Sequence, residues 1–181
     1  METTILLARH GETDWNLNRR VQGQSDTLLN ETGRAQAHAL ADELAGERID
    51  AVYSSDLVRA HETARIVAGT RGLNVTADPD LREKHFGTWE GLTDDEILVR
   101  FPEARRGPWG DGETTEDVSR RVLAALLRIA DGHPGGQVLV VAHGGALRAA
   151  LVHCGVEPPR AIANGHVARI AVRDGRLRQV H

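Results

Sequence analysis

The stretch "LLARHGETDWN", residues 6–16, decides the fold. Its first residues belong to an apolar run that starts near Thr4 and shows no alternation with polar residues. Runs of this kind are typical of parallel strands that helices cover on both faces. The run stops at Arg9 and His10, and charged side chains are rarely buried unless they are paired. We therefore expect a strand over Thr4–Ala8 that presents two polar side chains at the edge of a sheet.

Other segments indicate the neighbours of this strand. Apolar runs occur at Ala51–Ser54, at Asn74–Ala77 and at Gln137–Ala142, the last reading "QVLVVA". Amphipathic patterns lie between them, and one is the i, i+3, i+4, i+7 series of Ala37, Leu40, Ala41 and Leu44. This alternation predicts an α/β fold, a three-layer sandwich in which helices flank a mostly parallel central sheet.

Capping residues and turn signals predict where the elements begin and end. Asn30 or Thr32 is expected to cap the first long helix, and Asp56 to cap a second helix that runs to about Ala68. "TTED", residues 114–117, precedes a third helix marked by Val118, Val122, Ala125, Leu126 and Ile129. A fourth helix should follow His143 directly. A hairpin is expected around Asp174–Gly175, and Glu103–Thr115 is predicted to be a surface loop over one end of the sheet.

Composition sets the broad class of protein. The 181 residues predict a single domain over residues 1–181, and 40% hydrophobic with 27% charged residues is the balance of a globular protein. A net charge of −4 gives no reason to expect nucleic acid or an acidic membrane as a partner. No targeting signal is evident, so a cytoplasmic location is expected. Cys154 is the only cysteine, which excludes an internal disulfide, and we expect it to be a small buried residue.

Three strand ends carry groups that suit an anion. Arg9 and His10 end the first strand, Arg59 falls in the first turn of the second helix, and His143 stands at a strand-to-helix junction. The carboxyl ends of parallel strands converge at one edge of a sheet, where ligands bind. Gly11 and the pair Gly144–Gly145 follow the two histidines and allow close approach of the backbone, so we expect backbone amides to be available as further donors. Phosphate fits this set best.

A carboxylate is available in "LREKHFGTWEG", residues 81–91. Glu83 follows a strand end and is a candidate general acid for a leaving alcohol. On spacing alone, Glu12 and Glu90 are equally eligible.

"ARHGETDWN" resembles the Arg-His-Gly signature of the histidine phosphatase superfamily, which includes cofactor-dependent phosphoglycerate mutases and many small phosphatases. Further blocks are similar to the family's blocks in the same order, and the similarity covers most of the chain. They are "VQGQSDTLLNETGRAQA", "YSSDLVRAHETA", "LREKHFGTWEG", "GETTEDVSRRV" and "VVAHGGALRA". A single tripeptide is weak support, whereas five blocks in order are specific.

The resemblance implies a phosphoglycerate mutase-like fold and a role for each candidate. His10 would be the nucleophile that becomes phosphohistidine, and Glu83 would be the general acid. Arg9, Arg59 and His143 would hold the phosphoryl group. Asn16 would add a hydrogen bond. Gly144 is expected to contribute to substrate binding as well.

The function expected from these roles is a phosphomonoesterase of the histidine acid phosphatase type. It would hydrolyse a small phosphorylated metabolite and use no metal and no other cofactor. The alternative is a phosphoglycerate mutase, but the segment after Glu83 is short and its "FGTWEG" form is similar to the phosphatase branches. A non-catalytic phosphate-binding domain is disfavoured because both nucleophile and acid are present. An oxidoreductase of the Rossmann type lacks its Gly-x-Gly-x-x-Gly motif here. The sequence leaves open whether the protein forms a homodimer.

Several residues near the motifs carry secondary expectations. His85 and His166 are candidates to approach the site, although an ordinary surface role is favoured for each. Trp15 is a candidate to line a pocket, whereas packing is favoured for Phe86 and Trp89. Arg105 and Arg106 are candidates to hold a second anionic group, although an exposed charged loop is the favoured interpretation.

Overall fold

The predicted apolar strands form the centre of one mixed sheet. A computed structural model describes residues 1–105, 109–158 and 161–180. In this part of the chain the strands lie in the order β3-β2-β4-β1-β5-β6. Their bounds are β1 Thr3–Arg9, β2 Ala51–Ser54, β3 Val75–Ala77, β4 Gln137–Ala142, β5 Val167–Arg173 and β6 Arg176–Val180. β1 to β4 pair in parallel, and the hairpin β5–β6 adds two antiparallel strands. The mostly parallel sheet and the C-terminal hairpin are thereby confirmed.

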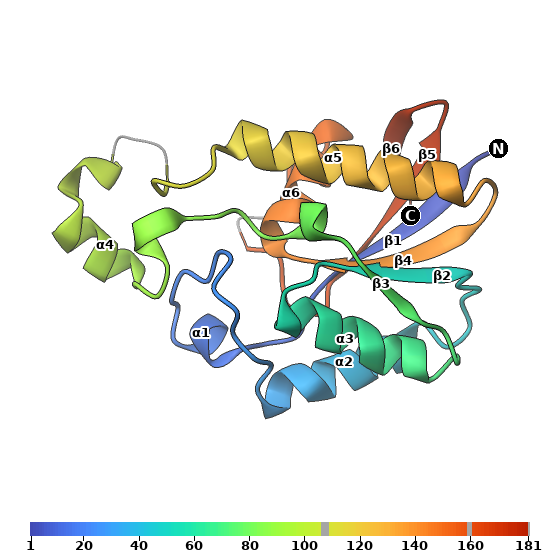
Figure 1. The fold of residues 1–181 in the computed structure, drawn as a ribbon, viewed down its shortest axis with the longest axis horizontal. Helices are drawn as coiled ribbons and strands as arrows, with labels where there is room; N and C mark the ends of the chain where they lie inside the picture. The colour runs from blue at the N-terminus through green and yellow to red at the C-terminus, as the bar shows by residue number, and fades with distance from the viewer. Residues whose placement is uncertain (106–108, 159–160, 181) are drawn as a thin grey trace.

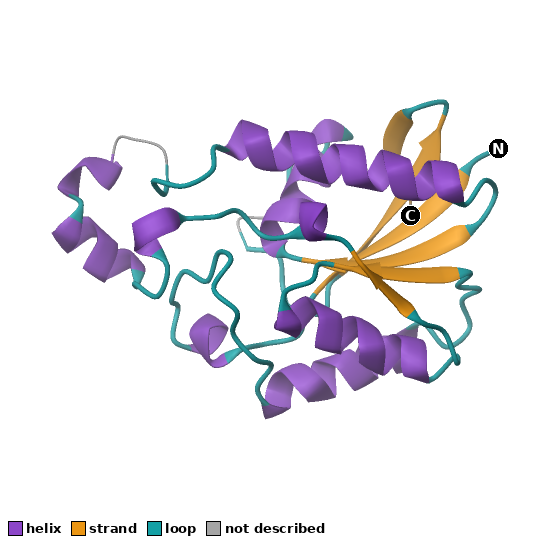
Figure 2. Ribbon diagram, viewed as in Figure 1, coloured by secondary structure: helices purple, strands orange, loops and turns teal. Residues whose placement is uncertain are grey.

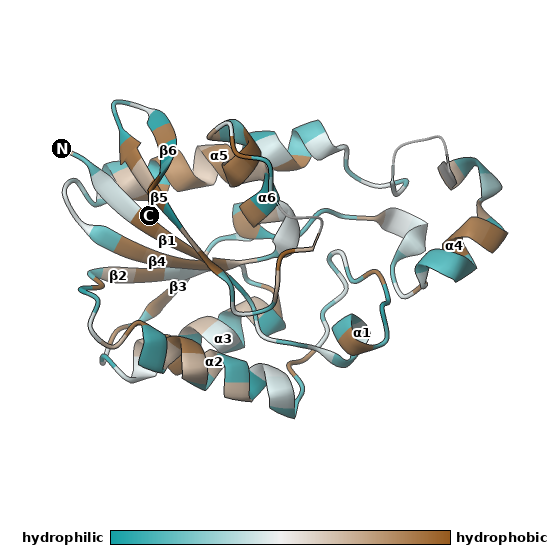
Figure 3. Cartoon of the chain, turned by 180° about the vertical axis from the view of Figure 1, so that it is seen from behind, coloured by the Kyte–Doolittle hydropathy of each residue, from teal (hydrophilic) through white to brown (hydrophobic). Residues whose placement is uncertain are grey.

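Helices cover both faces of the sheet, as Figures 1 and 2 show. α2 (Glu31–Glu43) and α3 (Val58–Gly69) lie on one face, and α5 (Thr115–Gly132) and α6 (Gly144–His153) lie on the other. β1 is buried from both sides because its successive side chains point to opposite layers, so Ile5 and Leu7 pack with one pair of helices and Leu6 and Ala8 with the other. In Figure 3 the middle parts of β1 and β4 are accordingly brown. The predicted three-layer sandwich is confirmed.

Capping residues explain where most helices begin. The Asn30 side chain accepts a hydrogen bond from the Gly33 amide at the start of α2, so Asn30 rather than Thr32 is the cap. Thr114 and Asp117 form a reciprocal capping box before α5, as "TTED" predicts.

The expected cap at Asp56 is wrong. α3 begins at Val58, and Leu57 holds the N-cap position without a side-chain hydrogen bond. The Asp56 carboxylate instead pairs with Arg82 at 2.6 Å, and Asp26 from a distant loop accepts from the Val58 amide at 2.7 Å. A tertiary contact thus replaces the local cap, and Arg59 still lies in the first turn.

The segment after Glu83 contains more structure than its sequence predicts. We call residues 84–113 the cap; it includes α4 (Asp94–Arg100) and the short 3-10 helices Gly87–Trp89 and Pro102–Arg105. α4 is missing from the expectations, as are α1 (Asp14–Leu17) and the 3-10 helix Pro79–Leu81. The predicted loop Glu103–Thr115 therefore begins inside a helical turn. The cap extends beyond the sheet edge in Figure 1. It has its own small core, in which Trp89, Ile97 and Ala104 are buried.

Cys154 differs modestly from expectation. Its side chain is half-buried against the larger core rather than fully buried, and burial raises the pKa of its thiol. Among the described residues no helix is long and apolar enough to cross a membrane.

Candidate active site

Strand pairing brings the two predicted histidines together. Arg9 lies opposite Ala142 in the parallel ladder between β1 and β4. The His10 amide continues that ladder by donating to the Ala142 carbonyl at 3.0 Å. His143 follows Ala142 directly, so the imidazoles of His10 and His143 lie edge to face with ring centroids 5.1 Å apart. Both side chains are buried.

The hydrogen bonds of His10 determine which nitrogen is available for chemistry. Its Nδ1 lies 2.6 Å from the Gly11 carbonyl oxygen, which can only accept, so Nδ1 carries the proton. Its Nε2 accepts from Arg59 Nε at 3.3 Å. Burial, reinforced by the charges of Arg59 and Arg9, lowers the pKa of His10 well below its usual value. At neutral pH the ring is therefore uncharged, with a lone pair on Nε2.

Arg59 is held as a fixed cation beside this lone pair. Its side chain is fully buried. Nη1 donates to the Ser25 carbonyl at 2.8 Å, and Nη2 donates to the Gly23 carbonyl at 2.7 Å. Burial lowers the pKa of Arg59 to about 10, so the guanidinium keeps its charge at neutral pH. A guanidinium fixed by two carbonyls has little freedom to move away from the site.

Three buried nitrogens at the site lack a protein partner. Arg9 Nε, His143 Nδ1 and His143 Nε2 are buried with no hydrogen bond to any described residue. A buried polar group without a partner costs about 1–3 kcal/mol, and such groups in native proteins call for an explanation. Burial and the charges of Arg59, His10 and Arg9 lower the pKa of His143 well below its usual value. An anion bound here would offer acceptor oxygens to these nitrogens.

Asn16 and Gly144 lie where the sequence expects them. Asn16 Oδ1 accepts from the Thr13 amide at 3.2 Å and from the Thr13 hydroxyl at 3.1 Å, which leaves its amide nitrogen to donate. Gly144 opens α6, and a Cβ placed on it would lie 3.8 Å from Arg9 Nε and 3.9 Å from Glu83 Oε2. The N-terminus of α6 therefore faces the same group of charged side chains.

Glu83 supplies the carboxylate. Its Oε1 accepts from the Lys84 amide at 2.8 Å, and its Oε2 accepts from the Gly145 amide at 3.0 Å. Any side chain at position 145 would collide with it, because a Cβ there would lie 2.0 Å from Glu83 Oε1. Close packing against the Glu83 carboxylate thus explains why position 145 is a glycine.

The structure distinguishes the three eligible carboxylates. A cavity of about 150 Å³ lies at the sheet edge, lined by Arg9, His10, Asn16, Arg20, Val21, Gln22, Gly23, Arg59, Glu83 and Phe86. Glu83 is in that lining, whereas Glu12 and Glu90 are not. Glu12 accepts from Asn30, and Glu90 accepts from Ser25 and Phe86 in the cap. We call this space the phosphate cavity.

Sequence reasoning missed the residue that holds the acid loop. Arg121 of α5 donates to the backbone carbonyls of Asp80, Arg82 and Glu83 at 2.9, 2.6 and 2.8 Å. It also pairs with the Glu113 carboxylate at 2.8 Å. The motif "SRRV" contains Arg120 and Arg121 side by side, and only the phase of the helix, which turns Arg121 inward, separates them.

The secondary candidates have mixed outcomes. His166 provides only its backbone carbonyl, to the Arg9 amide, and His85 lies in the cap beside Glu90. Neither side chain is among the described residues that line the phosphate cavity. Trp89 packs in the cap core as expected, whereas Phe86 also lines the cavity.

The remaining secondary candidates are Trp15 and the arginine pair. The Trp15 ring packs close to Gly91. Arg106 and the side chain of Arg105 lie outside the described residues. No group of three or more His, Cys, Asp or Glu residues that could hold a metal ion occurs in the part of the chain described.

The chain is similar in sequence to proteins named as phosphoglycerate mutase-like or as a phosphatase. The chain is 44% identical over 156 residues to the phosphoglycerate mutase-like protein 4 of Arabidopsis thaliana, a match that covers 80% of the chain and 67% of that protein. It is also 44% identical over 158 residues to the metal-independent phosphoserine phosphatase of the same plant, covering 81% of the chain and 66% of that protein. The match thus spans about two thirds of the length of these relatives.

Solved structures show the same fold over nearly the whole chain. YhfR of Bacillus stearothermophilus superposes with a TM-score of 0.89 at 37% identity, covering 98% of this chain and 95% of that one. A family model described as histidine phosphatase superfamily, branch 1, matches residues 5–180. Because that match covers nearly the whole chain, including part or all of each described strand and each residue of the phosphate cavity, the chain belongs to the histidine phosphatase superfamily.

Proposed function

We propose that the protein hydrolyses phosphate monoesters without a metal ion, through a phosphohistidine formed on His10. The observation that carries this proposal is the state of His10, a buried neutral imidazole whose Nε2 lone pair faces Arg59. A nucleophile must be unprotonated to attack. His10 meets this condition and lies among the nitrogens that an oxyanion would satisfy.

The first half of the reaction forms the phosphoenzyme. His10 Nε2 attacks phosphorus, and the bond from phosphorus to the ester oxygen breaks. Arg9, Arg59 and His143 compensate the charge on the phosphoryl oxygens, and such preorganised electrostatics is usually the largest contribution to catalysis. Glu83 gives its proton to the departing oxygen, which leaves as the alcohol.

The second half restores the enzyme. The Glu83 carboxylate takes a proton from water as that water attacks the phosphohistidine. The bond from phosphorus to Nε2 breaks, inorganic phosphate leaves, and His10 recovers its lone pair. Glu83 is protonated again for the next cycle, so atoms and protons balance without another reactant.

The relatives' names divide between phosphatase and mutase-like protein, and the cap favours hydrolysis. A mutase must shield phosphohistidine from water and return the phosphoryl group to a bound glycerate. The chain reaches the "GET" block at Gly112 soon after Glu83, which leaves a short cap for such shielding. A phosphatase of the histidine acid phosphatase type, acting on a small phosphorylated metabolite in the cytoplasm, is therefore our proposal, and a homodimer stays a prediction.

A product assay tests the proposal. Purified protein in EDTA is given a panel of phosphate monoesters and 3-phosphoglycerate, with and without 2,3-bisphosphoglycerate. We expect inorganic phosphate to be released without the bisphosphate, and vanadate, a five-coordinate mimic, to inhibit. Loss of activity on chelation that magnesium or zinc restores would contradict the metal-independent mechanism. Interconversion of 2- and 3-phosphoglycerate faster than phosphate release would establish the mutase alternative.

A further inference from the structure

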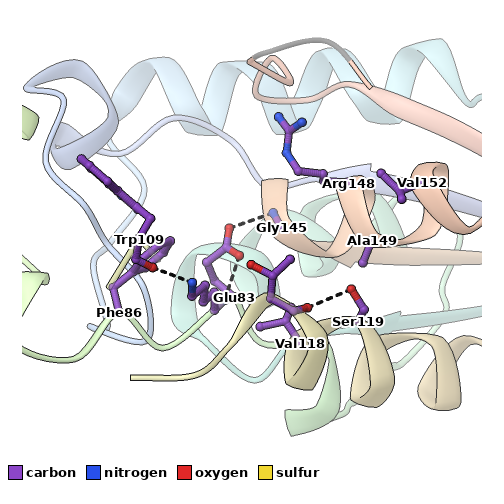
Figure 4. A pocket seen from close by; sticks show the side chains of 11 residues that line it. Glu83, Phe86, Trp109, Val118, Ser119, Gly145, Arg148, Ala149 and Val152 are labelled. Atoms are coloured by element: carbon purple, nitrogen blue, oxygen red, sulfur yellow. Dashed lines mark hydrogen bonds between the residues drawn. The ribbon is translucent and has the colours of Figure 1, made fainter. Parts of the chain in front are cut away.

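A second, larger cavity adjoins the phosphate cavity. It encloses about 430 Å³ between the N-terminal turns of α5, one side of α6 from Gly145 to Val152, and the cap. Figure 4 shows its side chains on both sides of Glu83, with Phe86 and Trp109 on one side and Val118, Ser119 and Ala149 on the other. The apolar residues among those that line it are Phe86, Trp109, Val118, Ala149 and Val152. We propose that this cavity binds an apolar body of the leaving alcohol, so that the substrates are monoesters of aryl or alkyl alcohols; this rests on the proposed function.

The position of Glu83 connects the two cavities. Glu83 and Phe86 line both of them. The acid donates its proton to the ester oxygen, so that oxygen must lie within hydrogen-bond reach of its carboxyl group. With phosphorus in the phosphate cavity, the carbon side of the ester projects past Glu83. The adjoining cavity is the space that receives it.

The size and lining of the cavity fit an apolar group. Its volume is about 430 Å³, within the range of about 300–1,000 Å³ that holds small-molecule ligands. α5 contributes Val118, α6 contributes Ala149, and the cap contributes Phe86. Burying a phenyl or branched alkyl group against such a surface is favourable in proportion to the area removed from water.

The cations in the lining are not arranged to hold a second anion. Lys84 Nζ donates to the Trp109 carbonyl at 2.5 Å and lies 5.3 Å from the centroid of the Phe86 ring. Its ammonium group therefore holds two segments of the cap together. In Figure 4 the Arg148 side chain points away from Glu83 and Ser119. These positions favour an apolar body over a carboxylate or a second phosphate.

Three substrates test the proposal on the wild-type protein. They are ethyl phosphate, 2-phenylethyl phosphate and phosphoserine, of which the first two have leaving alcohols of similar acidity. We expect kcat/KM for 2-phenylethyl phosphate to exceed that for ethyl phosphate by at least about tenfold, the effect of filling an apolar pocket. Equal values, or a preference for phosphoserine, would overturn the apolar assignment. Absence of phosphate release from all three would instead refute the proposed function.

A variant in which a larger side chain fills the second cavity provides a matched comparison. Ala149→Phe places a ring into the cavity from α6 and is expected to lower kcat/KM for 2-phenylethyl phosphate at least about tenfold. It should lower kcat/KM for ethyl phosphate much less, because the ethyl group fills only a small part of the second cavity, and it should leave vanadate inhibition unchanged, because vanadate occupies the phosphate cavity. Ala124→Phe on the exposed face of α5 is the control. Ser119→Phe, at the half-buried rim, replaces Ala149→Phe if that variant does not fold. An equal loss on ethyl phosphate would overturn the proposal.

A separate observation concerns Arg121. Its guanidinium donates to three carbonyls of the chain that leads up to and includes Glu83. Its partner Glu113 accepts from the His85 amide at 2.9 Å, so the turn is fastened from both ends. The side chain is 17% exposed and does not line the phosphate cavity. We infer that Arg121 is a positioning residue that sets the Glu83 carboxyl group for proton transfer.

The dependence on the leaving group tests this role. Arg121→Lys keeps the charge but loses the fork that spans the carbonyls. We expect kcat/KM for ethyl phosphate, which reports the phosphorylation step, to fall up to about 10²-fold, the scale of a small misplacement. kcat/KM for p-nitrophenyl phosphate, whose leaving group needs little protonation, should fall much less. Arg120→Lys, on the exposed face of the same helix, is the control. Equal losses with both substrates would show a merely structural role and overturn the inference.

Discussion

The edge of the sheet at His10 and the cap over it are held in place by different kinds of contact. His10 and His143 are positioned by the backbone ladder between β1 and β4. The cap depends on side-chain carboxylates that accept from backbone amides. Glu90 accepts from Gln24, Ser25 and Phe86, and Asp111 accepts from Thr88. The backbone ladder at the sheet edge does not depend on the identity of single side chains, whereas the contacts that hold the cap do.

This difference suggests a division of labour. Residues on the strand ends meet the phosphoryl group, which every monoester shares. Residues of the cap and of α6 meet the alcohol, which differs between substrates. Changes at the sheet edge should therefore affect all substrates, and changes in the cap should affect selectivity or local stability. The following predictions test that division, from the largest expected effect to the smallest.

Replacing the nucleophile should abolish turnover with every substrate. His10→Ala removes the nitrogen that forms the covalent intermediate, and we expect the rate to fall by at least about 10⁴-fold. Circular dichroism checks that the variant folds, and His166→Ala, a change at an exposed histidine outside the phosphate cavity, is the control. Acid-labile phosphate trapped on the wild type should map to His10. Label on His143 would show that the nucleophile is assigned wrongly.

Replacing the acid should divide substrates by their leaving groups. Glu83→Gln keeps the size of the side chain but loses the transferable proton, so we expect a loss of about 10²- to 10⁴-fold with an alkyl phosphate. With p-nitrophenyl phosphate the first step should remain fast, giving a burst of p-nitrophenol followed by slow turnover. Glu12→Gln tests the rival carboxylate and should leave the rate unchanged. If the two variants exchange these behaviours, Glu12 is the acid.

The buried histidines should make stability depend on pH. Their pKa values lie well below 6.5 in the folded protein, so as pH falls through 6.5 the unfolded chain takes up protons that the folded protein does not. The free energy of unfolding should therefore decrease on acidification, by up to about 1.4 kcal/mol per pH unit for each histidine.

Urea unfolding between about pH 5 and 7, above the range where carboxylates titrate, measures this slope. His10→Ala should reduce the slope to about half, because one of the two buried histidines remains. An unchanged slope in that variant would show that the pH dependence arises elsewhere.

The smallest effect is expected in the cap. Glu90→Gln weakens the hydrogen bonds from Ser25 and Phe86, and we expect the free energy of unfolding to fall by about 1–2 kcal/mol. Glu62→Gln removes a surface ion pair with Arg34 and is the control, with an expected change of about 0–1 kcal/mol. A larger effect at Glu62 than at Glu90 would mean that carboxylates do not hold the cap.

The features that sequence alone predicts divide in the same way between the sheet edge and the cap. Gln137–Ala142 and the convergence of Arg9, His10 and His143 were predictable, because continuous apolar runs report burial and parallel strands share an edge. The cap was not predicted, because α4 has only 7 residues and its apolar residues pack mostly within the cap itself rather than against the sheet. The capping box of Thr93 and Glu96 is the signal in the sequence that could have located α4. The start of α3 was missed for a different reason, since Asp26 lies 32 residues away from the amide it caps.

Identifying Glu83 as the acid from physical reasoning alone likewise required the three-dimensional structure. Glu12, Glu83 and Glu90 each stand near a glycine in the sequence, and only the packing of Gly145 against Glu83 places one of them at the cavity. The inward position of Arg121 also needed the fold, because its neighbour Arg120 has the same side chain. The family resemblance identified the acid where spacing could not.

The strand order has a consequence for association between molecules. The two edges are β3, which has 3 residues, and β6, in which exposed Arg176 and Arg178 flank Leu177. Short edges and edges with charged side chains resist pairing with another chain. The sheet is therefore protected against edge-to-edge aggregation, and a dimer of this protein would have to form through the helices or the cap.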